Sequence, residues 1–246
     1  MNPDRHQEVK KYTDGDTAIL FVHGIQGSPC QFRFLTDVLE GDVSFYNLLL
    51  PGHGSDCRAF GKSGIESWQR AVTNAASQLK NKYKKVYFVG HSMGCLLGLR
   101  AYLTDHIAFD GMMLISCPLK LRFTLRYLTH NHLTVIVKNS KNLYMHASEE
   151  ANSISARHPF QYIRCFHPYV ELLKLIKITR SELRKMPISV HAVHMERDEI
   201  VSARSMDILA ALGDISRTTY PVCGHNYFTV DAKKSMAAML KKMIGR

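Results

Sequence analysis

The chain has 246 residues, of which 46% are hydrophobic and 22% charged, and this balance is typical of one globular domain or of one domain with an insertion. It contains no run of about 18 apolar residues, and residues 1–16 lack the apolar core of a secretory signal, so we expect neither a membrane-spanning helix nor secretion. The net charge of +11 does not by itself indicate a nucleic-acid partner, because zinc-finger, basic-zipper and RNP-type signatures are all absent.

The six cysteines are scattered along the chain and form no C-x-x-C pair. Without a secretory signal they are expected to be reduced thiols, which predicts a cytoplasmic location. The pairs His130/His132 and His191/His194 have no Cys, Asp or Glu residues at the spacing of a metal site, so no metal is expected. No pattern predicts an oligomeric state.

Short and nearly continuous apolar runs recur along the chain, as expected for strands that are buried on both faces of a parallel sheet. The runs are Thr17–Val22, Ser44–Leu49, Val86–Val89, Met112–Ser116, Ile188–Val193 and Ile215–Tyr220. Apolar residues at helical spacing lie between them, in residues 32–39, 65–79, 93–103, 206–212 and 236–243. This alternation predicts an α/β fold with a doubly wound, mostly parallel sheet of about six strands.

The alternation stops between Pro118 and Pro187, where most of the net positive charge lies. We predict that residues 1–117 and 188–246 form the core, and that residues 118–187 form an inserted cap over the carboxyl edge of the sheet. The inner face of this cap is expected to line an apolar pocket. Its candidate wall residues are Phe123, Leu125, Tyr127, Leu128, Ile136, Leu143, Tyr144, Phe160, Tyr162 and Phe166.

Residues 170–185 of the insertion have a helical pattern with a basic side and an apolar side. The basic side holds Lys174, Lys177, Arg180 and Arg184, and the apolar side holds Leu172, Leu173, Leu175 and Ile176. The simplest interpretation is a solvated face over a packed face. The alternative is weak contact with an anionic membrane surface or an acidic substrate.

A serine stands between two glycines in Gly90-His91-Ser92-Met93-Gly94, after a predicted strand and before an apolar helix. A G-x-S-x-G sequence in this place is a nucleophile elbow. Gly90 and Gly94 allow neighbouring chains to approach the sharp turn without Cβ clashes. We therefore predict that Ser92 is a nucleophile, at a helix N-terminus that favours negative charge.

A serine nucleophile needs a base that a third group holds in place. In folds with this elbow the chain order is Ser, acid, His, and His225 is the only histidine after residue 194. Three carboxylates, those of Glu196, Asp198 and Glu199, follow the preceding strand. Each of them is also explained as a solvated loop charge, so the spacing alone leaves the acid open.

The loop after the first predicted strand reads His23-Gly24-Ile25-Gln26-Gly27. Its glycines, Gly24 among them, allow a backbone N–H, best assigned to Ile25, to point at the same position as the N–H of Met93. Two fixed donors of this kind would hold a developing oxyanion. His23 is interpreted as a hydrogen-bonding brace, because a second base has no proton to move.

Together these segments resemble the α/β-hydrolase superfamily, and more closely its bacterial carboxylesterases and monoacylglycerol lipases. The resemblance rests on HGIQG, on Pro51-Gly52-His53-Gly54, on GHSMG, on Trp68 and on Gly224-His225, in the family's order. It covers most of residues 15–117 and 188–246 and fades over 118–187, where the family has its lid. It implies Asp198 as the acid, ester hydrolysis as the reaction and no cofactor.

We therefore expect a serine hydrolase that cleaves a small-molecule ester with an apolar acyl group, through an acyl-enzyme on Ser92. The same triad would also serve thioesters, amides or C–C bonds. A ligand-binding protein without catalysis is the alternative from another class. Such proteins often have a damaged triad, whereas every part is present here.

Overall fold

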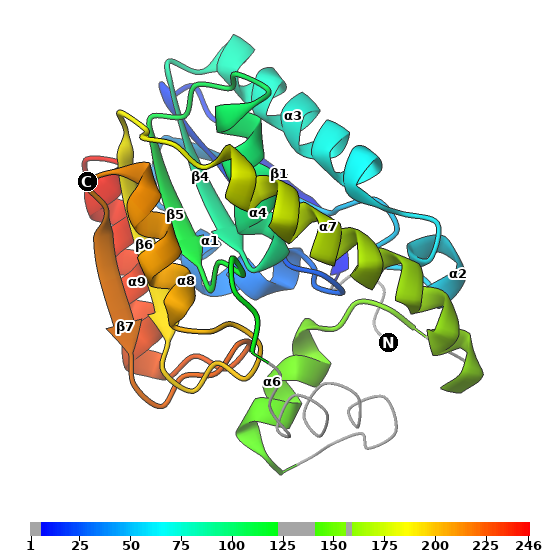
Figure 1. Cartoon of the computed structure of the whole chain (residues 1–246). Helices are drawn as coiled ribbons and strands as arrows, with labels where there is room; N and C mark the ends of the chain where they lie inside the picture. The colour runs from blue at the N-terminus through cyan, green and yellow to red at the C-terminus, as the bar shows by residue number, and fades with distance from the viewer. Residues whose placement is uncertain (1–5, 123–140, 156–158) are drawn as a thin grey trace.

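The computed structural model describes residues 6–122, 141–155 and 159–246. Its centre is a sheet of seven strands in the order β1-β3-β2-β4-β5-β6-β7, with helices on both faces (Figure 1). The strands are β1 (Val9–Lys11), β2 (Thr17–Val22), β3 (Val43–Leu48), β4 (Lys85–His91), β5 (Gly111–Ile115), β6 (Ser189–Met195) and β7 (Ser216–Tyr220). The predicted α/β fold with a doubly wound, mostly parallel sheet is thereby confirmed.

The predicted number of about six strands is one short of the observed number. Each of the six apolar runs overlaps a strand, and these strands pair in parallel. The additional strand, β1, pairs antiparallel with β3 at the edge of the sheet. It has three residues, of which Lys10 and Lys11 are charged, so it gives no apolar run; short, lysine-bearing strands are common at sheet edges.

The helices cover both faces of the sheet. They are α1 (Arg33–Thr36), α2 (Cys57–Phe60), α3 (Ile65–Lys82), α4 (Met93–Leu103), α6 (Leu143–Ala151), α7 (Phe166–Glu182), α8 (Arg204–Leu209) and α9 (Val230–Met243), with 3-10 turns at Pro29–Phe32, Pro159–Cys165 and Ala210–Leu212. Leu20 of β2 packs in one buried cluster with Trp68 of α3 and Leu96 of α4. Its neighbour Phe21 packs on the opposite face with Met236 of α9, because side chains alternate along a strand.

The helix expected in the insertion is α7, which packs on α3 and α4. Leu175 and Thr179 are fully buried there, and Glu182 forms a salt bridge with Arg100 of α4 at 2.8 Å. Leu173, which we expected on the packed side, is instead 52% exposed. Two residues along a helix are about 160° apart around its axis, so Leu173 cannot share a face with Leu175.

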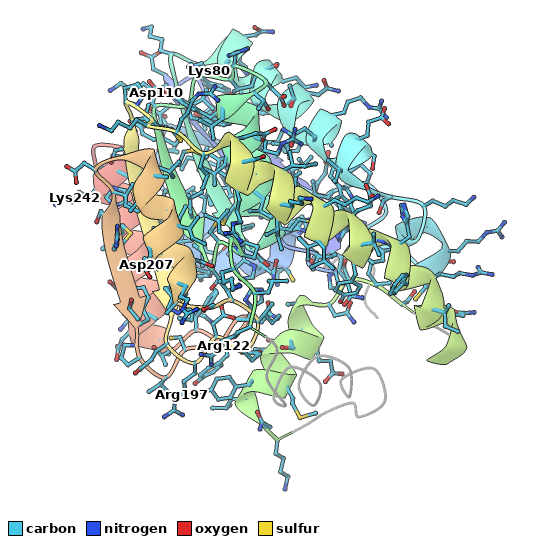
Figure 2. The ribbon with its side chains drawn as sticks, viewed as in Figure 1. Lys80, Asp110, Arg122, Arg197, Asp207 and Lys242 are labelled. Atoms are coloured by element: carbon cyan, nitrogen blue, oxygen red, sulfur yellow. The ribbon has the colours of Figure 1, made fainter. Side chains whose placement is uncertain are left out.

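The carboxyl ends of the parallel strands meet at one edge of the sheet. Arg122 and Arg197 lie at this edge, whereas Lys80 and Asp110 lie at the opposite end (Figure 2). Ligands of open α/β sheets bind beyond the carboxyl ends of the strands. The loops that leave this edge are therefore the place to look for a site.

Two further observations bear on the sequence analysis. The six cysteines form no disulfide. In the part of the chain that the structure describes, no helix is long and apolar enough to cross a membrane.

Candidate active site

Ser92 occupies a strained turn between β4 and α4. Its backbone angles are φ 51° and ψ −122°, a left-handed conformation that residues with a Cβ rarely adopt. A Cβ at Gly90 would lie 2.8 Å from the Cys95 nitrogen, and one at Gly94 would lie 2.0 Å from the Val22 carbonyl oxygen. Both contacts require glycine, and the turn places Ser92 at the start of α4.

Asp198 and His225 come from the loops after β6 and β7, and they are in direct contact. His225 Nδ1 lies 2.9 Å from Asp198 Oδ2 and 3.1 Å from Oδ1. Asp198 Oδ1 also accepts the amides of Ile200 and Val201, at 2.9 and 2.7 Å. An ionised carboxylate can only accept, so Nδ1 of the imidazole carries a proton, and Nε2 has the lone pair when the ring is neutral.

Burial and charge act in opposite directions on this pair. Burial lowers the pKa of His225, but the charge and hydrogen bond of Asp198 and the charge of Glu199 together outweigh burial, and the net pKa is raised above the ordinary value. For Asp198, burial raises the pKa, but the charge and hydrogen bond of His225 and the two amides outweigh burial and hold the net pKa below the ordinary value. Asp198 is therefore ionised at neutral pH.

Ser92 and His225 line the same cavity. Within the described residues, the hydrogen bonds of the His225 ring lead to Asp198, and none joins it to Ser92 Oγ. Hydrogen bonds between a nucleophile and its base are often long without substrate and tighten in the complex. The structure thus joins Asp198 and His225 directly and places Ser92 beside them at the cavity.

Two buried histidines hold the loop after β2. His23 Nε2 accepts the Leu50 amide at 3.0 Å, and its Nδ1 donates to the Gly24 carbonyl at 2.9 Å. His53 Nε2 accepts the Gln26 amide at 3.2 Å. Burial lowers the pKa of His53 to about 4 and that of His23 well below its ordinary value, so both are neutral braces. A bracing role was expected for His23 from the sequence, whereas none was expected for His53.

The braced loop lies against Ser92. A Cβ at Gly24 would lie 2.9 Å from the Cβ of Ser92, and Ile25 lines the same cavity as Ser92. Among the described residues, neither the Ile25 amide nor the Met93 amide donates a hydrogen bond. Both donors are therefore available to a ligand oxygen.

We predict that Gly24→Ala lowers kcat by about 10²-fold, because the new methyl group displaces Ser92 or the loop by a fraction of an ångström to an ångström. The measurement is the hydrolysis of a short p-nitrophenyl ester. Gly111→Ala is the matched control, since its Cβ would meet the Tyr87 ring at 3.2 Å and Met243 at 3.4 Å, and neither residue lines the cavity. Equal activity of the two variants would contradict the prediction.

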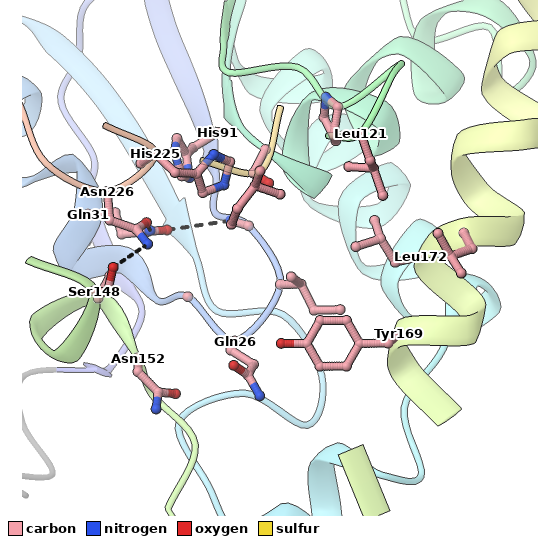
Figure 3. A pocket seen from close by; sticks show the side chains of 18 of the residues that line it. Gln26, Gln31, His91, Leu121, Ser148, Asn152, Tyr169, Leu172, His225 and Asn226 are labelled. Atoms are coloured by element: carbon pink, nitrogen blue, oxygen red, sulfur yellow. Dashed lines mark hydrogen bonds between the residues drawn. The ribbon is translucent and has the colours of Figure 1, made fainter. Parts of the chain in front are cut away.

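The cavity beside Ser92 has a volume of about 290 Å³. One wall is apolar. Four of its residues belong to α7, namely Phe166, Tyr169, Leu172 and Leu173, and three come from the loops after β2, β5 and β6, namely Ile25, Leu121 and Ile200. The other wall is polar and contains Gln31, Ser148, Asn152 and Asn226. Figure 3 shows Leu121, Tyr169 and Leu172 on one side and Gln31, Ser148 and Asn226 on the other.

A hydrogen-bonded chain crosses the polar wall (Figure 3). Gln31 Oε1 accepts the Gly24 amide at 3.4 Å, and Gln31 Nε2 donates to Asn226 Oδ1 at 3.1 Å. Asn226 Nδ2 donates to Ser148 Oγ of α6 at 3.3 Å. The chain therefore ties the loop after β2 to the His225 loop and to the insertion. No sequence pattern had indicated a role for these residues, although Asn226 directly follows the predicted base.

Among residues 118–187, the expected wall residues that the structure describes lie in different surroundings. Phe166 lines the cavity, whereas Leu143 lines a neighbouring pocket and Tyr144 packs on Tyr227. Five others, Phe123, Leu125, Tyr127, Leu128 and Ile136, lie outside the described residues, as do the side chains of Phe160 and Tyr162. The apolar wall is made instead by residues of the insertion that we had not chosen, mainly Leu121, Tyr169 and Leu172.

Glu199 differs from the expectation of a solvated charge, because it is only 2% exposed, whereas Glu196 is exposed.

Among the described residues, no three His, Cys, Asp or Glu side chains are grouped as metal ligands.

Comparison with known sequences identifies relatives of the chain. Residues 19–238 match the Alpha/beta hydrolase family. The chain is 29% identical over 131 residues to Lipid droplet hydrolase 1 of Saccharomyces cerevisiae, an alignment that covers 46% of this chain and 35% of that protein. It is also 29% identical over 96 residues to a thermostable monoacylglycerol lipase of Bacillus sp., with 38% and 37% covered. The alignments thus span little more than a third of the length of these relatives.

Solved structures share the fold at low sequence identity. A structure described with the metagenome-derived lipolytic enzymes LipS and LipT has a TM-score of 0.71 and 15% identity, and 98% of each chain is covered. The monoacylglycerol lipase of Paleococcus ferrophilus has a TM-score of 0.67 and 16% identity, with 96% of this chain and 98% of that chain covered. At these identities the likeness concerns the fold alone.

Proposed function

The chain belongs to the alpha/beta hydrolase family, and from its site we propose that it hydrolyses carboxylic esters through an acyl-enzyme on Ser92. The observation that carries the proposal is the His225–Asp198 pair, with Nδ1 protonated, beside a strained serine at the start of a helix. This combination is what a serine nucleophile needs for activation. The lipase and hydrolase names of the two sequence relatives agree with it.

In the proposed mechanism, Nε2 of His225 removes the hydroxyl proton of Ser92 while Oγ attacks the ester carbonyl. The amides of Ile25 and Met93 bind the resulting oxyanion, and such donors typically contribute about 10²–10³-fold each to the rate. His225 then protonates the leaving alcohol as the tetrahedral intermediate collapses. Water, deprotonated by His225, releases the acid from Ser92 and restores the hydroxyl.

The apolar wall supports an apolar acyl group. Leu121, Tyr169 and Leu172 offer no charge to an acyl chain, and the cavity of about 290 Å³ accepts a chain of several carbons. Burial of methylene groups against such a wall contributes about 0.8 kcal/mol each. A preference for medium or long acyl chains follows.

The polar wall supports a hydroxylated alcohol, as in a monoacylglycerol. His225 must protonate the leaving alcohol, so the alcohol lies on the His225 side of Ser92. Asn226 and Gln31 stand on that side, and each amide group keeps hydrogen-bonding capacity beyond the bonds that it makes in the chain to Ser148. These groups would bind the free hydroxyls of a polyol.

A panel of esters tests this function. It contains p-nitrophenyl esters of graded chain length, a monoacylglycerol and the methyl ester of the same acid, and the matching thioester and anilide. We expect the highest kcat/KM for oxygen esters of medium or long acids, and a higher value for the monoacylglycerol than for the methyl ester. Faster cleavage of the thioester or anilide would favour that alternative, and no turnover would favour a ligand-binding protein.

We predict that Leu172→Trp shortens the preferred acyl chain, because the indole fills part of the apolar side of the cavity. The kcat/KM for an octanoate or dodecanoate ester should fall at least about tenfold, the effect of two lost methylene contacts, while that for acetate changes little. The control is Ile178→Trp, on the same helix but 37% exposed and outside the cavity wall. An equal loss at every chain length would contradict the acyl assignment.

Exposed apolar side chains of α7 and of the turn before it support weak contact with an anionic membrane surface. Ile163, Phe166 and Leu173 are 73%, 72% and 52% exposed. The exposed cations Lys174 and Lys177 lie on the same helix as two of them. Apolar side chains among cations are typical of segments that lie on anionic bilayers.

A further inference from the structure

A second carboxylate contacts the catalytic histidine through its main chain. Glu199 follows Asp198 directly, yet its side chain is 2% exposed. Glu199 Oε2 accepts the backbone N–H of His225 at 3.1 Å. A buried carboxylate is costly unless charges or hydrogen bonds compensate it, so its place beside His225 needs an explanation.

The backbone carbonyl of His225 is also held by a buried side chain. His91 is 2% exposed, and its Nε2 lies 2.9 Å from the His225 carbonyl oxygen. A carbonyl only accepts, so Nε2 of His91 carries a proton and donates it. Burial lowers the pKa of His91 to about 3, and the ring is therefore neutral at the pH of catalysis. The ring centroids of His91 and His225 are 4.9 Å apart, and Figure 3 shows the two rings side by side.

The loop around His225 is shaped to admit the Glu199 carboxylate. A Cβ at Gly224 would lie 3.1 Å from Glu199 Oε2 and 2.6 Å from the Tyr144 ring. Glycine at 224 thus leaves room for the carboxylate on one side and for a cap residue on the other. The triad by itself does not require glycine at position 224, whereas the positions of Glu199 and Tyr144 do.

We propose that Glu199 and His91 are positioning residues that clamp the main chain of His225 from both sides, and that the Glu199 carboxylate also stabilises the imidazolium formed during acyl transfer. This proposal rests on the proposed triad. Asp198 fixes the ring at Nδ1, Glu199 fixes the amide and His91 fixes the carbonyl. With all three contacts in place, the His225 ring is held in one orientation, with Nε2 toward the cavity and Ser92.

The charges that face His225 decide how its protonation responds to the loss of Glu199. Asp198 and Glu199 raise the pKa of His225 against burial. The neutral His91 packs against it, His194 lies near enough to interact with it, and Arg122 acts on His194 in turn. General-base catalysis needs a neutral imidazole, so kcat/KM falls as the pH decreases through the raised pKa. Removal of one negative charge moves that fall to lower pH.

The test compares Glu199→Gln with Glu199→Leu across pH 5–9. Gln keeps an oxygen that accepts the His225 amide but has no charge. We therefore expect the acid limb of the kcat/KM profile to move to lower pH by about 0.5–1 unit, because the lost charge acts on His225 with partial screening. The maximal kcat should fall less than about tenfold. Leu removes both interactions, so the same shift should come with a loss of kcat approaching about 10²-fold.

Glu196→Gln is the matched control, because it removes an exposed charge from the same loop and should leave the profile unchanged. Melting temperatures and fluorophosphonate labelling at pH 8 identify variants that fail to fold. A folded Glu199→Gln enzyme with the wild-type profile would overturn the role of its charge, and a Leu variant as fast as the Gln variant would overturn the clamp. Full activity of Ser92→Ala would instead overturn the triad on which the proposal rests.

Discussion

Ser92→Ala is expected to abolish ester hydrolysis and to leave the fold intact. The substitution removes only the hydroxyl group, and no hydrogen bond of the described residues depends on that group. Alanine carries the same Cβ into the same strained turn, so the backbone cost stays equal. Loss of a nucleophilic serine typically lowers kcat about 10⁶-fold. Initial rates on the preferred p-nitrophenyl ester and circular dichroism would measure both expectations.

The chain provides a close control for this variant. Ser116 directly follows the neighbouring strand β5, is 1% exposed and has the same φ of 51°. It does not line the cavity, so Ser116→Ala should keep full activity. Fluorophosphonate should label the wild-type protein on Ser92 and leave Ser92→Ala unlabelled. Labelling of another serine, or hydrolysis by Ser92→Ala at the wild-type rate, would exclude Ser92 as the nucleophile.

Much of the fold follows from patterns of neighbouring residues. A run such as Thr17–Val22 is apolar at nearly every position because β2 is covered by helices on both faces, and this is visible without any knowledge of distant contacts. β1 is not visible in the same way, because its residues are held by pairing with β3 and contribute little apolar surface. A strand that depends on its partner gives no local signal.

The residues of the site also differ in whether a local sequence pattern indicates them. Ser92 and Gly94 belong to a short motif whose spacing reflects the turn itself, so the sequence indicates them directly. Glu199 is buried against the loop of Gly224 and His225, which is far from it in sequence. Likewise the exposure of Leu173 depends on how α7 packs on α3 and α4, so its assignment to the packed side of the helix was wrong. Residues whose role arises from packing between loops need the structure.

The choice of acid among the three carboxylates leads to the second large effect. Asp198→Asn is expected to lower kcat about 10⁴-fold, as loss of the acid does in a serine triad. In the wild type, Asp198 Oδ1 accepts two main-chain amides, while Oδ2 faces Nδ1 of His225. Asparagine would keep its oxygen at the two amides and so turn its NH₂ group toward Nδ1.

An NH₂ group in that place donates to Nδ1 and thereby moves the imidazole proton to Nε2. His225 would then present an N–H to Ser92 and could not take its proton, although the geometry is unchanged. The rate on a p-nitrophenyl ester at its pH optimum measures the effect, and a crystal structure of the variant would show the unchanged geometry. Glu196→Gln should retain the wild-type rate, because its charge is exposed. If Glu196→Gln lost as much activity as Asp198→Asn, or if Asp198→Asn kept a tenth of the wild-type rate, Asp198 would not be the residue that holds the tautomer of His225.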